Sequence, residues 1–334
     1  MIQDARVLQS EFVPGDIVRR DAELNAITRA LNPITRGESG ETTCLFGPTG
    51  VGKTCTAKYI FERLRERVID LNTNYINCWE APTKFKILHQ VLDGVHKTVD
   101  IHRQSTPTDV LTDRLHDYDG PPYIVILDEV DQLHDTRTLY DLSRMRELTM
   151  ILIANREEEL FARLDDRVSS RLKTATCIDF DPYSTTALVA ILQDRVQWGL
   201  EEGAITTSQL ETIAETAAGD ARVAIGILRG AARQAMQDGG TEITDELIQD
   251  TVSHAKAEIK RQTLDRLTED QRVLFEIVSE NGDIAPSDLY DAYQNRVDEP
   301  KTNRMVRNYL SKMCQYNLIV ANGENRGRTY RTKV

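Results

Sequence analysis

The sequence predicts an α/β protein in three parts: a parallel-sheet domain, a small helical domain and a C-terminal unit of three helices and a β-hairpin. Three observations support this fold class. Short apolar runs alternate with helical patterns between residues 42 and 180, strand patterns stop near residue 184, and the last helical patterns are followed by two short apolar runs around a polar turn. We expect the domains to span residues 1–182, 183–261 and 262–334.

The first domain contains five apolar runs that we interpret as strands. The run Tyr123–Leu127 is apolar throughout rather than alternating, which is typical of a strand covered on both faces. A parallel sheet with flanking helices is therefore predicted. The predicted strands are Thr42–Phe46, Asn74–Cys78, Tyr123–Leu127, Thr149–Ala154 and Thr176–Phe180.

The second domain is predicted to be helical. Its helical patterns cover about 184–200, 206–218, 220–237 and 244–260. Gly203, Gly219 and the pair Gly239-Gly240 separate them, because glycine ends helices readily.

The third domain begins at Thr268-Glu-Asp-Gln271, a capping box in which each end satisfies a free backbone N–H of the other. The helix that it opens is followed by two more, predicted over Pro286–Gln294 and Pro300–Tyr316. The runs Leu318–Ala321 and Thr329–Arg331 then form a hairpin. Three helices followed by a hairpin is the plan of a winged helix.

The net charge of −12, from 41 basic and 53 acidic residues, argues by itself against binding nucleic acid. The charge is unevenly distributed, however. Residues 301–334 carry +7, and residues 1–300 carry −19. Any contact with nucleic acid is therefore expected in the last domain.

Composition also limits the class of protein. No stretch approaches the ~18 consecutive apolar residues of a membrane span, and the N-terminus lacks a secretory pattern, so we expect a cytoplasmic, nucleoid-associated protein without a membrane partner. The five cysteines are scattered and never spaced as C-x-x-C, which indicates neither a disulfide framework nor a zinc site. With 30 Arg but only 11 Lys, the acidic sequence resembles proteins of salt-loving archaea.

A phosphate-binding loop lies between the first predicted strand and the following helix. Its glycines allow backbone N–H groups to surround phosphates, and the start of the helix favours an anion. The nucleotide is expected to be ATP or ADP, with Lys53 in contact with the β-phosphate and, in ATP, the γ-phosphate, and with the Thr54 hydroxyl holding Mg²⁺. The loop is Gly47-Pro48-Thr49-Gly50-Val51-Gly52-Lys53-Thr54.

Polar residues also follow two of the buried strands. Asp128 and Glu129 end Tyr123–Leu127, where Asp128 is expected to join the Mg²⁺ shell and Glu129 to polarise a water that attacks the γ-phosphate. Asn155 ends Thr149–Ala154, and it either orients that water or is an ordinary turn residue.

These residues together resemble the AAA+ ATPases, and more narrowly the archaeal origin-recognition (Orc-type) replication initiators. The resemblance runs from about Phe12 to the C-terminus. It rests on an extended Walker B motif, sensor 1, an arginine-finger box and sensor 2, which are Leu127–Leu133, Ile153–Asn155, Leu164–Leu172 and Gly219–Ala224.

The resemblance implies roles for further residues. Asn155 becomes a sensor of the γ-phosphate, and Arg222 becomes a lid contact to the same nucleotide. Arg171 or Arg167 would reach the ATP of a neighbouring subunit, and the sequence leaves open which of them does so. Residues 12–23 look like the family's N-terminal stretch that packs beside the adenine.

The predicted helix 300–316 is suited to a DNA groove. Val306, Leu310 and Met313 fall on one face. Arginine reads guanine and asparagine reads adenine in the major groove, while arginines at the hairpin tip contact phosphates or the minor groove. The expected DNA-binding residues are Arg304, Arg307, Asn308, Ser311, Lys312, Arg326 and Arg328.

The resemblance implies an ATP-dependent origin-binding initiator with slow, switch-like hydrolysis. Its partners would be duplex DNA, the replicative MCM helicase and paralogous initiators. Two other classes remain open: a STAND-type ATP-gated transcription or signalling regulator, and a clamp-loader-like or helicase-loader ATPase without site-specific DNA binding.

Overall fold

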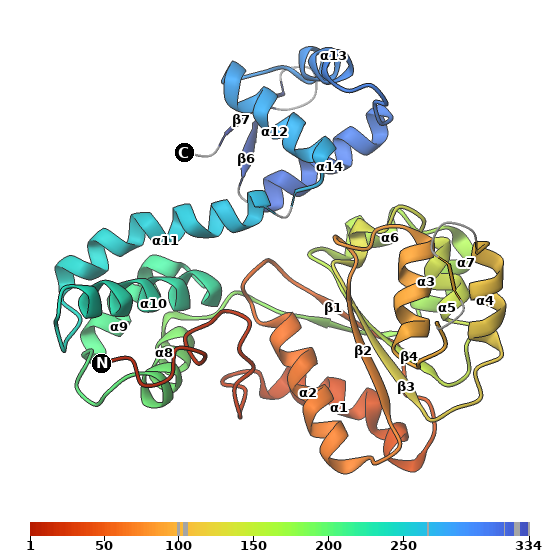
Figure 1. The fold of residues 1–334 in the computed structure, drawn as a ribbon, viewed down its shortest axis with the longest axis horizontal. Coiled ribbons are helices and arrows are strands. Elements are labelled where there is room, and N and C mark those ends of the chain that lie inside the picture. The colour runs from red at the N-terminus through yellow and green to blue at the C-terminus, as the bar shows by residue number, and fades with distance from the viewer. Residues whose placement is uncertain (99–100, 103–105, 266, 317, 324–327, 333–334) are drawn as a thin grey trace. The chain divides into compact units, whose positions relative to one another are not determined.

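The computed structural model describes residues 1–98, 101–102, 106–265, 267–316, 318–323 and 328–332 (Figure 1). The chain divides into two compact units, Met1–Ile225 and Gly226–Val334. The predicted division into three domains remains a prediction.

The first unit is built on a five-stranded sheet of order β2-β3-β4-β1-β5, in which all neighbouring strands are parallel. The fold class and the five predicted strands are confirmed, with ends that differ by one or two residues. The strands are β1 Thr43–Phe46, β2 Asn72–Asn77, β3 Tyr123–Asp128, β4 Leu148–Ile153 and β5 Thr176–Asp179.

Helices cover both faces of this sheet, which explains why β3 and β4 are buried along their whole length (Figure 1). Side chains alternate along a strand, so Val125 and Leu127 enter one core, whereas Ile124 and Ile126 enter the other. The first core is closed by α3 Lys84–Asp93, α4 Thr108–His116, α5 Arg137–Leu142, α6 Glu157–Phe161 and α7 Asp166–Leu172. The second is closed by α1 Asp21–Leu31, η1 Asn32–Arg36 and α2 Lys53–Arg67.

Helices replace strands after β5, as predicted. The helix α8 Thr185–Gly199 begins at the capping Ser184, and α9 Thr207–Ala217 begins with a capping box at Thr206. The helices that follow are α10 Ala221–Gln237 and α11 Asp245–Asp265.

The C-terminal half of the second unit has the predicted element order. The capping box at Thr268 and Gln271 is present. Ile284 also exchanges two backbone hydrogen bonds with Tyr330, of 2.8 and 2.9 Å, which adds an isolated bridge to the hairpin. The elements are α12 Glu269–Asn281, α13 Pro286–Arg296, α14 Asn303–Gln315, β6 Ile319–Asn322 and β7 Thr329–Thr332.

The start of α14 differs from the prediction by three residues. Thr302 is the N-cap, and its hydroxyl accepts a hydrogen bond from the Met305 N–H, so the helix begins at Asn303 rather than at Pro300. A capping hydroxyl satisfies one of the free N–H groups of the first turn, which fixes the start of a helix.

Candidate functional site

The loop from Gly47 to Thr54 joins β1 to α2 and is shaped by glycines. Gly50 and Gly52 have φ values of +77° and +90°, in the left-handed region that favours glycine. A Cβ atom on Gly50 would lie 1.9 Å from Oδ1 of Asp220. The loop therefore depends on glycine both for its backbone conformation and for the space that Asp220 occupies.

Lys53 begins α2 and bends back over the loop. Its side chain is largely buried, and Nζ donates hydrogen bonds to the carbonyl oxygens of Gly47 at 2.5 Å and Pro48 at 2.7 Å. These bonds fix the ammonium group against the backbone of the loop. A cation held in this way is already placed for a phosphate group.

Asp128, at the end of β3, faces the same loop. Its Oδ2 accepts hydrogen bonds from the Thr54 hydroxyl at 2.7 Å and the Tyr75 hydroxyl at 2.9 Å, and its Oδ1 accepts one from the Glu129 N–H at 3.0 Å. Burial and the nearby Asp128 carboxylate raise the pKa of Tyr75, which keeps this donor protonated. The two predicted metal ligands, Thr54 and Asp128, thus lie side by side.

These two oxygen ligands fit Mg²⁺. That ion takes few protein ligands and completes its shell with water and phosphate oxygens. A hydroxyl and a carboxylate beside a phosphate-binding loop supply that kind of donor set.

Glu129 follows Asp128 in a strained conformation. Its φ of 55° lies in the left-handed region, which is unusual for a residue with a side chain. The turn is stabilised because the Gln132 N–H donates to its carbonyl oxygen at 2.8 Å, at the start of η2 Val130–Gln132. Strain of this kind often marks functional positions, which agrees with the expected role of Glu129.

Asn155, just beyond β4, also meets the loop. Its carbonyl oxygen accepts a hydrogen bond from the Gly47 N–H at 3.2 Å. Because β4 lies between β3 and β1, the ends of three neighbouring strands bring together Asp128, Asn155 and Gly47. This is the edge of an open parallel sheet where ligands bind.

The start of α10 contacts the loop through Asp220 and Ala221. The Ala221 N–H donates to the Gly50 carbonyl oxygen at 3.0 Å. The Asp220 carboxylate accepts from the N–H groups of Arg222 and Val223 at 2.8 and 3.1 Å, and burial raises its pKa. The sequence singled out Arg222, whose side chain is half-buried here, but Asp220 is the residue that lies against the loop.

Arg20 is a second contact that sequence reasoning did not single out. Its guanidinium is 5% exposed and donates to the carbonyl oxygens of Val51 at 3.0 Å and Asp181 at 2.6 Å. It also pairs with Glu23 at 2.6 Å and lies over the ring of Tyr183, 4.1 Å from the centroid. The buried arginine thus ties the phosphate loop to the segment after β5.

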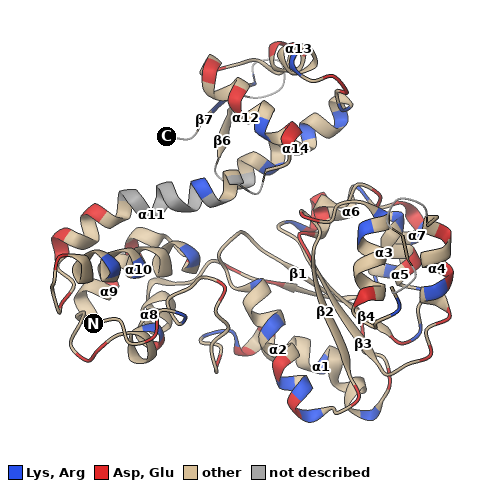
Figure 2. Ribbon diagram, viewed as in Figure 1, with Lys and Arg blue, Asp and Glu red and all other residues tan. Residues whose placement is uncertain are grey.

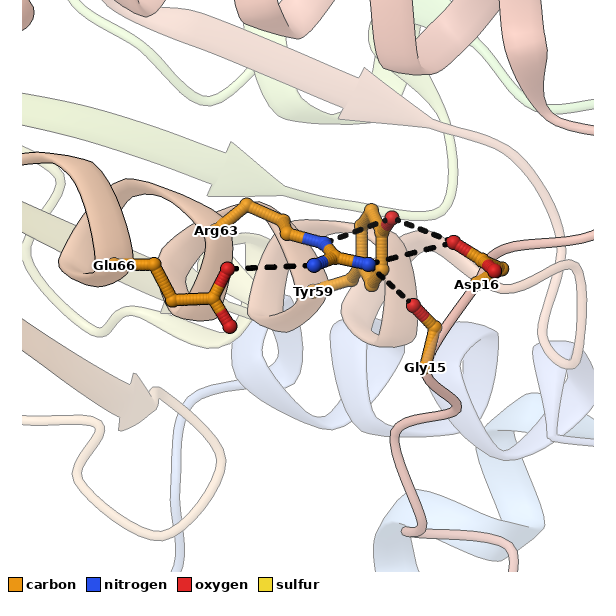
Figure 3. Close-up of polar contacts among 5 residues, drawn as sticks. All are labelled: Gly15, Asp16, Tyr59, Arg63 and Glu66. Carbon is orange, nitrogen blue, oxygen red and sulfur yellow. Dashed lines mark hydrogen bonds and ion pairs between the residues drawn. The ribbon is translucent and has the colours of Figure 1, made fainter.

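Two more arginines hold the N-terminal segment. Arg195 of α8 donates to the carbonyl oxygens of Val7 and Phe12 at 2.7 and 3.1 Å. Arg63 of α2 donates to the carbonyl oxygen of Gly15 at 2.7 Å, within a small network of polar contacts (Figure 3). The other members of that network are Asp16, Tyr59 and Glu66.

The two candidate arginine fingers lie on α7. Both Arg167 and Arg171 are exposed. The Arg171 guanidinium lies 5.1 Å from the centroid of the Tyr140 ring and donates to the Ser143 carbonyl oxygen at 3.3 Å. Those contacts are to α5 and the residue after it, not to the phosphate loop of the same chain.

The exposed face of α14 is the second candidate surface (Figure 2). Val306, Leu310 and Met313 are buried as predicted. The residues on the exposed face are Arg304, Arg307, Asn308 and Ser311. The Arg307 Nε donates to the Tyr290 hydroxyl at 3.2 Å, which links this face to α13.

Lys312 does not lie where the sequence pattern placed it. It is only 2% exposed, and its Nζ lies 4.8 Å from the centroid of the Tyr316 ring. The ring covers the lysine at the margin of the polar face. Of the two hairpin arginines, Arg328 is exposed, and Arg326 lies outside the described residues.

Among the described residues, no helix is long and apolar enough to span a bilayer.

Comparison with known proteins relates the chain to one family. The AAA domain matches residues 36–164, and the Cdc6 AAA+ ATPase-type lid domain matches residues 189–253. ORC1-type DNA replication protein 1 of Halobacterium salinarum is 56% identical over 308 residues, 92% of this chain and 100% of that protein. ORC1-type DNA replication protein 9 of the same organism is 48% identical over 330 residues, 99% of this chain and 93% of that protein.

A solved structure agrees with the fold. The Aeropyrum pernix ORC1 protein in complex with DNA matches with a TM-score of 0.78 at 23% identity, over 99% of this chain and 94% of that one. The resemblance to origin-recognition initiators is confirmed, and the similarity to Halobacterium proteins agrees with the haloarchaeal composition.

Proposed function

The chain belongs to the ORC1-type DNA replication proteins and is an AAA+ ATPase, and from that premise we propose that it binds duplex DNA at replication origins in an ATP-dependent state and promotes loading of the replicative MCM helicase. One observation carries the proposal. The same chain contains a phosphate loop hydrogen-bonded into a fixed arrangement and, in its +7 C-terminal segment, a helix with an exposed basic and amide face.

In the nucleotide site, the backbone of the loop surrounds the phosphates and Lys53 contacts the β- and γ-phosphates. Thr54 and Asp128 would hold Mg²⁺, which would supply neutralisation of the phosphate charge. Glu129 holds the attacking water in line with the γ-phosphate and accepts a proton from it as a general base. Tyr75 keeps the Asp128 carboxylate oriented by its hydrogen bond of 2.9 Å.

Three further residues respond to the γ-phosphate in this proposal. Asn155 senses it from the end of β4, and Arg222 contacts it from the start of α10. Arg171 or Arg167 of a neighbouring subunit neutralises transition-state charge, an effect typically worth about 10³–10⁵ in rate where such a finger acts. ATP hydrolysis would then require a neighbouring subunit, which agrees with a protein that hydrolyses ATP slowly and acts as a switch.

The DNA contact is assigned to α14 and the hairpin. Arg304, Arg307, Asn308 and Ser311 lie on the exposed face that would enter a major groove. We assign the phosphate contacts beside it to Arg328 and Arg326. Lys312 is left out because it is buried, and the −19 carried by residues 1–300 disfavours nonspecific binding elsewhere.

Footprinting of the DNA that flanks the protein's own gene tests the proposal. We expect protection of repeated sites near the gene with ATP, and loss of the ATP dependence in Lys53→Ala. Protection at promoters alone would favour the STAND-type regulator. Absence of any specific protection would favour the loader without site-specific binding.

The helicase and paralogous initiators are the proposed protein partners. Pull-down of the MCM helicase by the origin-bound protein, compared with the protein free of DNA, tests the first. Equal recovery in the two states would contradict a role in origin-dependent loading.

A further inference from the structure

Two cysteines face each other at the base of the phosphate loop. Cys44 of β1 is the register partner of Cys177 of β5, and the two strands are parallel, so both side chains point to the same face of the sheet. The two thiols interact with each other, and the Cys177 Sγ also donates a weak hydrogen bond to the Ala175 carbonyl oxygen at 3.9 Å. Cys44 is fully buried, whereas Cys177 is exposed on the edge strand.

This arrangement makes the two thiols chemically unequal. The hydrogen bond from the Cys44 thiol lowers the pKa of Cys177, although burial and the carboxylates of Glu157 and Asp179 oppose the shift. The same bond, together with burial, raises the pKa of Cys44. Since the thiolate is the reactive form, Cys177 is the nucleophile of the pair and is also the one that solvent reaches.

The pKa values of two other cysteines are shifted upward instead. Burial raises the pKa of Cys55 and of Cys314. Neither combines exposure with a lowered pKa, and Cys78 is buried. A mild oxidant should therefore react first at Cys177.

The strand spacing allows a bond between the two sulfurs. Adjacent strands lie about 4.7–4.9 Å apart, and disulfides join residues whose Cα atoms are about 4.4–6.8 Å apart. The disulfide can therefore form within the existing sheet, but its Cβ atoms lie only about 3.5–4.5 Å apart, so closing it draws β1 and β5 slightly together.

We propose that Cys44 and Cys177 form a peroxide-sensitive dithiol whose disulfide joins β1 to β5 below the phosphate loop and weakens nucleotide binding. The Cys177 thiolate attacks one oxygen of hydrogen peroxide, the O–O bond breaks, and Cys177 becomes a sulfenic acid. The hydroxide that leaves takes up the proton that the Cys177 thiol released on ionising and becomes water. The Cys44 sulfur then attacks the Cys177 sulfur, the S–O bond breaks, and the departing hydroxide takes the Cys44 proton to form water. Two thiols are oxidised and one peroxide is reduced to two waters.

The cysteine pair is linked to nucleotide binding through the contacts between β1 and the residue after β5 where the phosphate loop begins. Phe46 and Gly47 lie two and three residues after Cys44 in the chain, and the Phe180 N–H donates to the Phe46 carbonyl oxygen at 2.7 Å. A Cβ atom on Gly47 would lie only 2.3 Å from the Phe180 carbonyl oxygen. With so little room, a shift of β1 against β5 changes the entry of the phosphate loop.

The test treats the full chain with hydrogen peroxide, alkylates the remaining thiols, digests the protein and identifies linked peptides by mass spectrometry. We expect a Cys44–Cys177 disulfide in the wild type, with a several-fold weaker ATP affinity that returns after reduction. In the Cys177→Ser variant, Cys44 should remain a free thiol that can be alkylated, and peroxide should leave the ATP affinity of the variant unchanged. Cys314→Ser is the matched control and should behave like the wild type.

Two results would overturn the proposal. Recovery of Cys177 in higher oxidation states while Cys44 remains a free thiol would show that the pair does not close. A disulfide that forms without any change in ATP affinity would refute its effect on the loop. Both readouts are independent of DNA binding, so they stand apart from the proposed function in replication.

Discussion

Charged side chains at the phosphate loop are largely buried, whereas those on the exposed face of α14 are in contact with solvent. At the loop, Lys53 and Asp128 are largely buried and each is held by hydrogen bonds to named neighbours. On α14, Arg304 and Asn308 project from the helix into solvent. The loop is therefore a fixed site for one small anionic ligand, and the helix is an adaptable surface for a long polyanion.

This difference predicts how each region responds to mutation. Removing one partner of a buried charged group leaves the other without compensation, so single substitutions at the loop should have large effects. Each exposed contact with a DNA phosphate contributes a small and roughly equal amount to the affinity for DNA. The following predictions test that contrast.

The largest effect is expected from Lys53→Ala. Loss of a charge-assisted contact of about 3 kcal/mol corresponds to a decrease in ATP affinity of roughly 100-fold or more. Titration with a fluorescent ATP analogue measures it. Arg65→Ala, an exposed residue of the same helix, is the control, and unchanged ATP binding by Lys53→Ala would refute the assignment of the loop.

The second largest effect is expected from Gly50→Ala, with Gly37→Ala as its match. The two glycines have nearly equal φ values of +77° and +78°, but only a Cβ on Gly50 would collide with Asp220. Gly37→Ala should lower the free energy of unfolding by about 1 kcal/mol, and Gly50→Ala by about 2–3 kcal/mol. Urea denaturation compares them.

A double variant tests the cause of that difference. Adding Asp220→Ala should recover part of the loss caused by Gly50→Ala, because the collision disappears. Strictly additive losses would mean that Asp220 does not restrict the loop.

A smaller, graded effect is expected at the hairpin. Arg326→Ala with Arg328→Ala should weaken binding to all duplexes and reduce the slope of log affinity against log salt by about 2. Fluorescence anisotropy at several salt concentrations measures the slope. Arg296→Ala removes a charge that is paired with Glu280, so it should leave the slope unchanged. An unaltered slope in the double variant would exclude phosphate contacts by the hairpin.

The smallest effect is expected from Arg20→Lys. Lysine keeps the charge but lacks the planar group that bonds two carbonyl oxygens and stacks on Tyr183. We therefore expect the free energy of ATP binding to become less favourable by about 1 kcal/mol. Calorimetric titration with ATP, ADP and AMP measures it. A loss equal for all three nucleotides would contradict a role in positioning the β- and γ-phosphates.

Local sequence patterns were sufficient to predict the strands and the phosphate loop. The strands could be recognised because they are continuous apolar runs, and Thr54 and Asp128 because each lies at a fixed position in a motif. Their contact, across 74 residues of sequence, follows from the order of the parallel strands.

The contacts of Arg20 and Asp220 could not be predicted in this way. Apart from its ion pair with Glu23, Arg20 bonds residues 31 and 161 positions away, and the acceptors there are backbone carbonyl oxygens, which every residue carries. No residue type or spacing therefore indicates the partner. The burial of Lys312 was missed for a related reason, because a helical pattern gives the side of the helix but not the ring that covers it.

The way the N-terminal segment is held has a consequence for how this protein can evolve. Arg195 and Arg63 bind the carbonyl oxygens of Val7, Phe12 and Gly15, and the Arg195 guanidinium also lies 4.8 Å from the centroid of the Phe12 ring. Substitutions at exposed positions such as Gln9 can then accumulate while the path of the backbone stays the same, whereas the buried Val7 and Leu8 are constrained by packing. Selection should act on the two distant arginines and on the buried side chains, so related sequences can diverge at the exposed positions and still fold this segment identically.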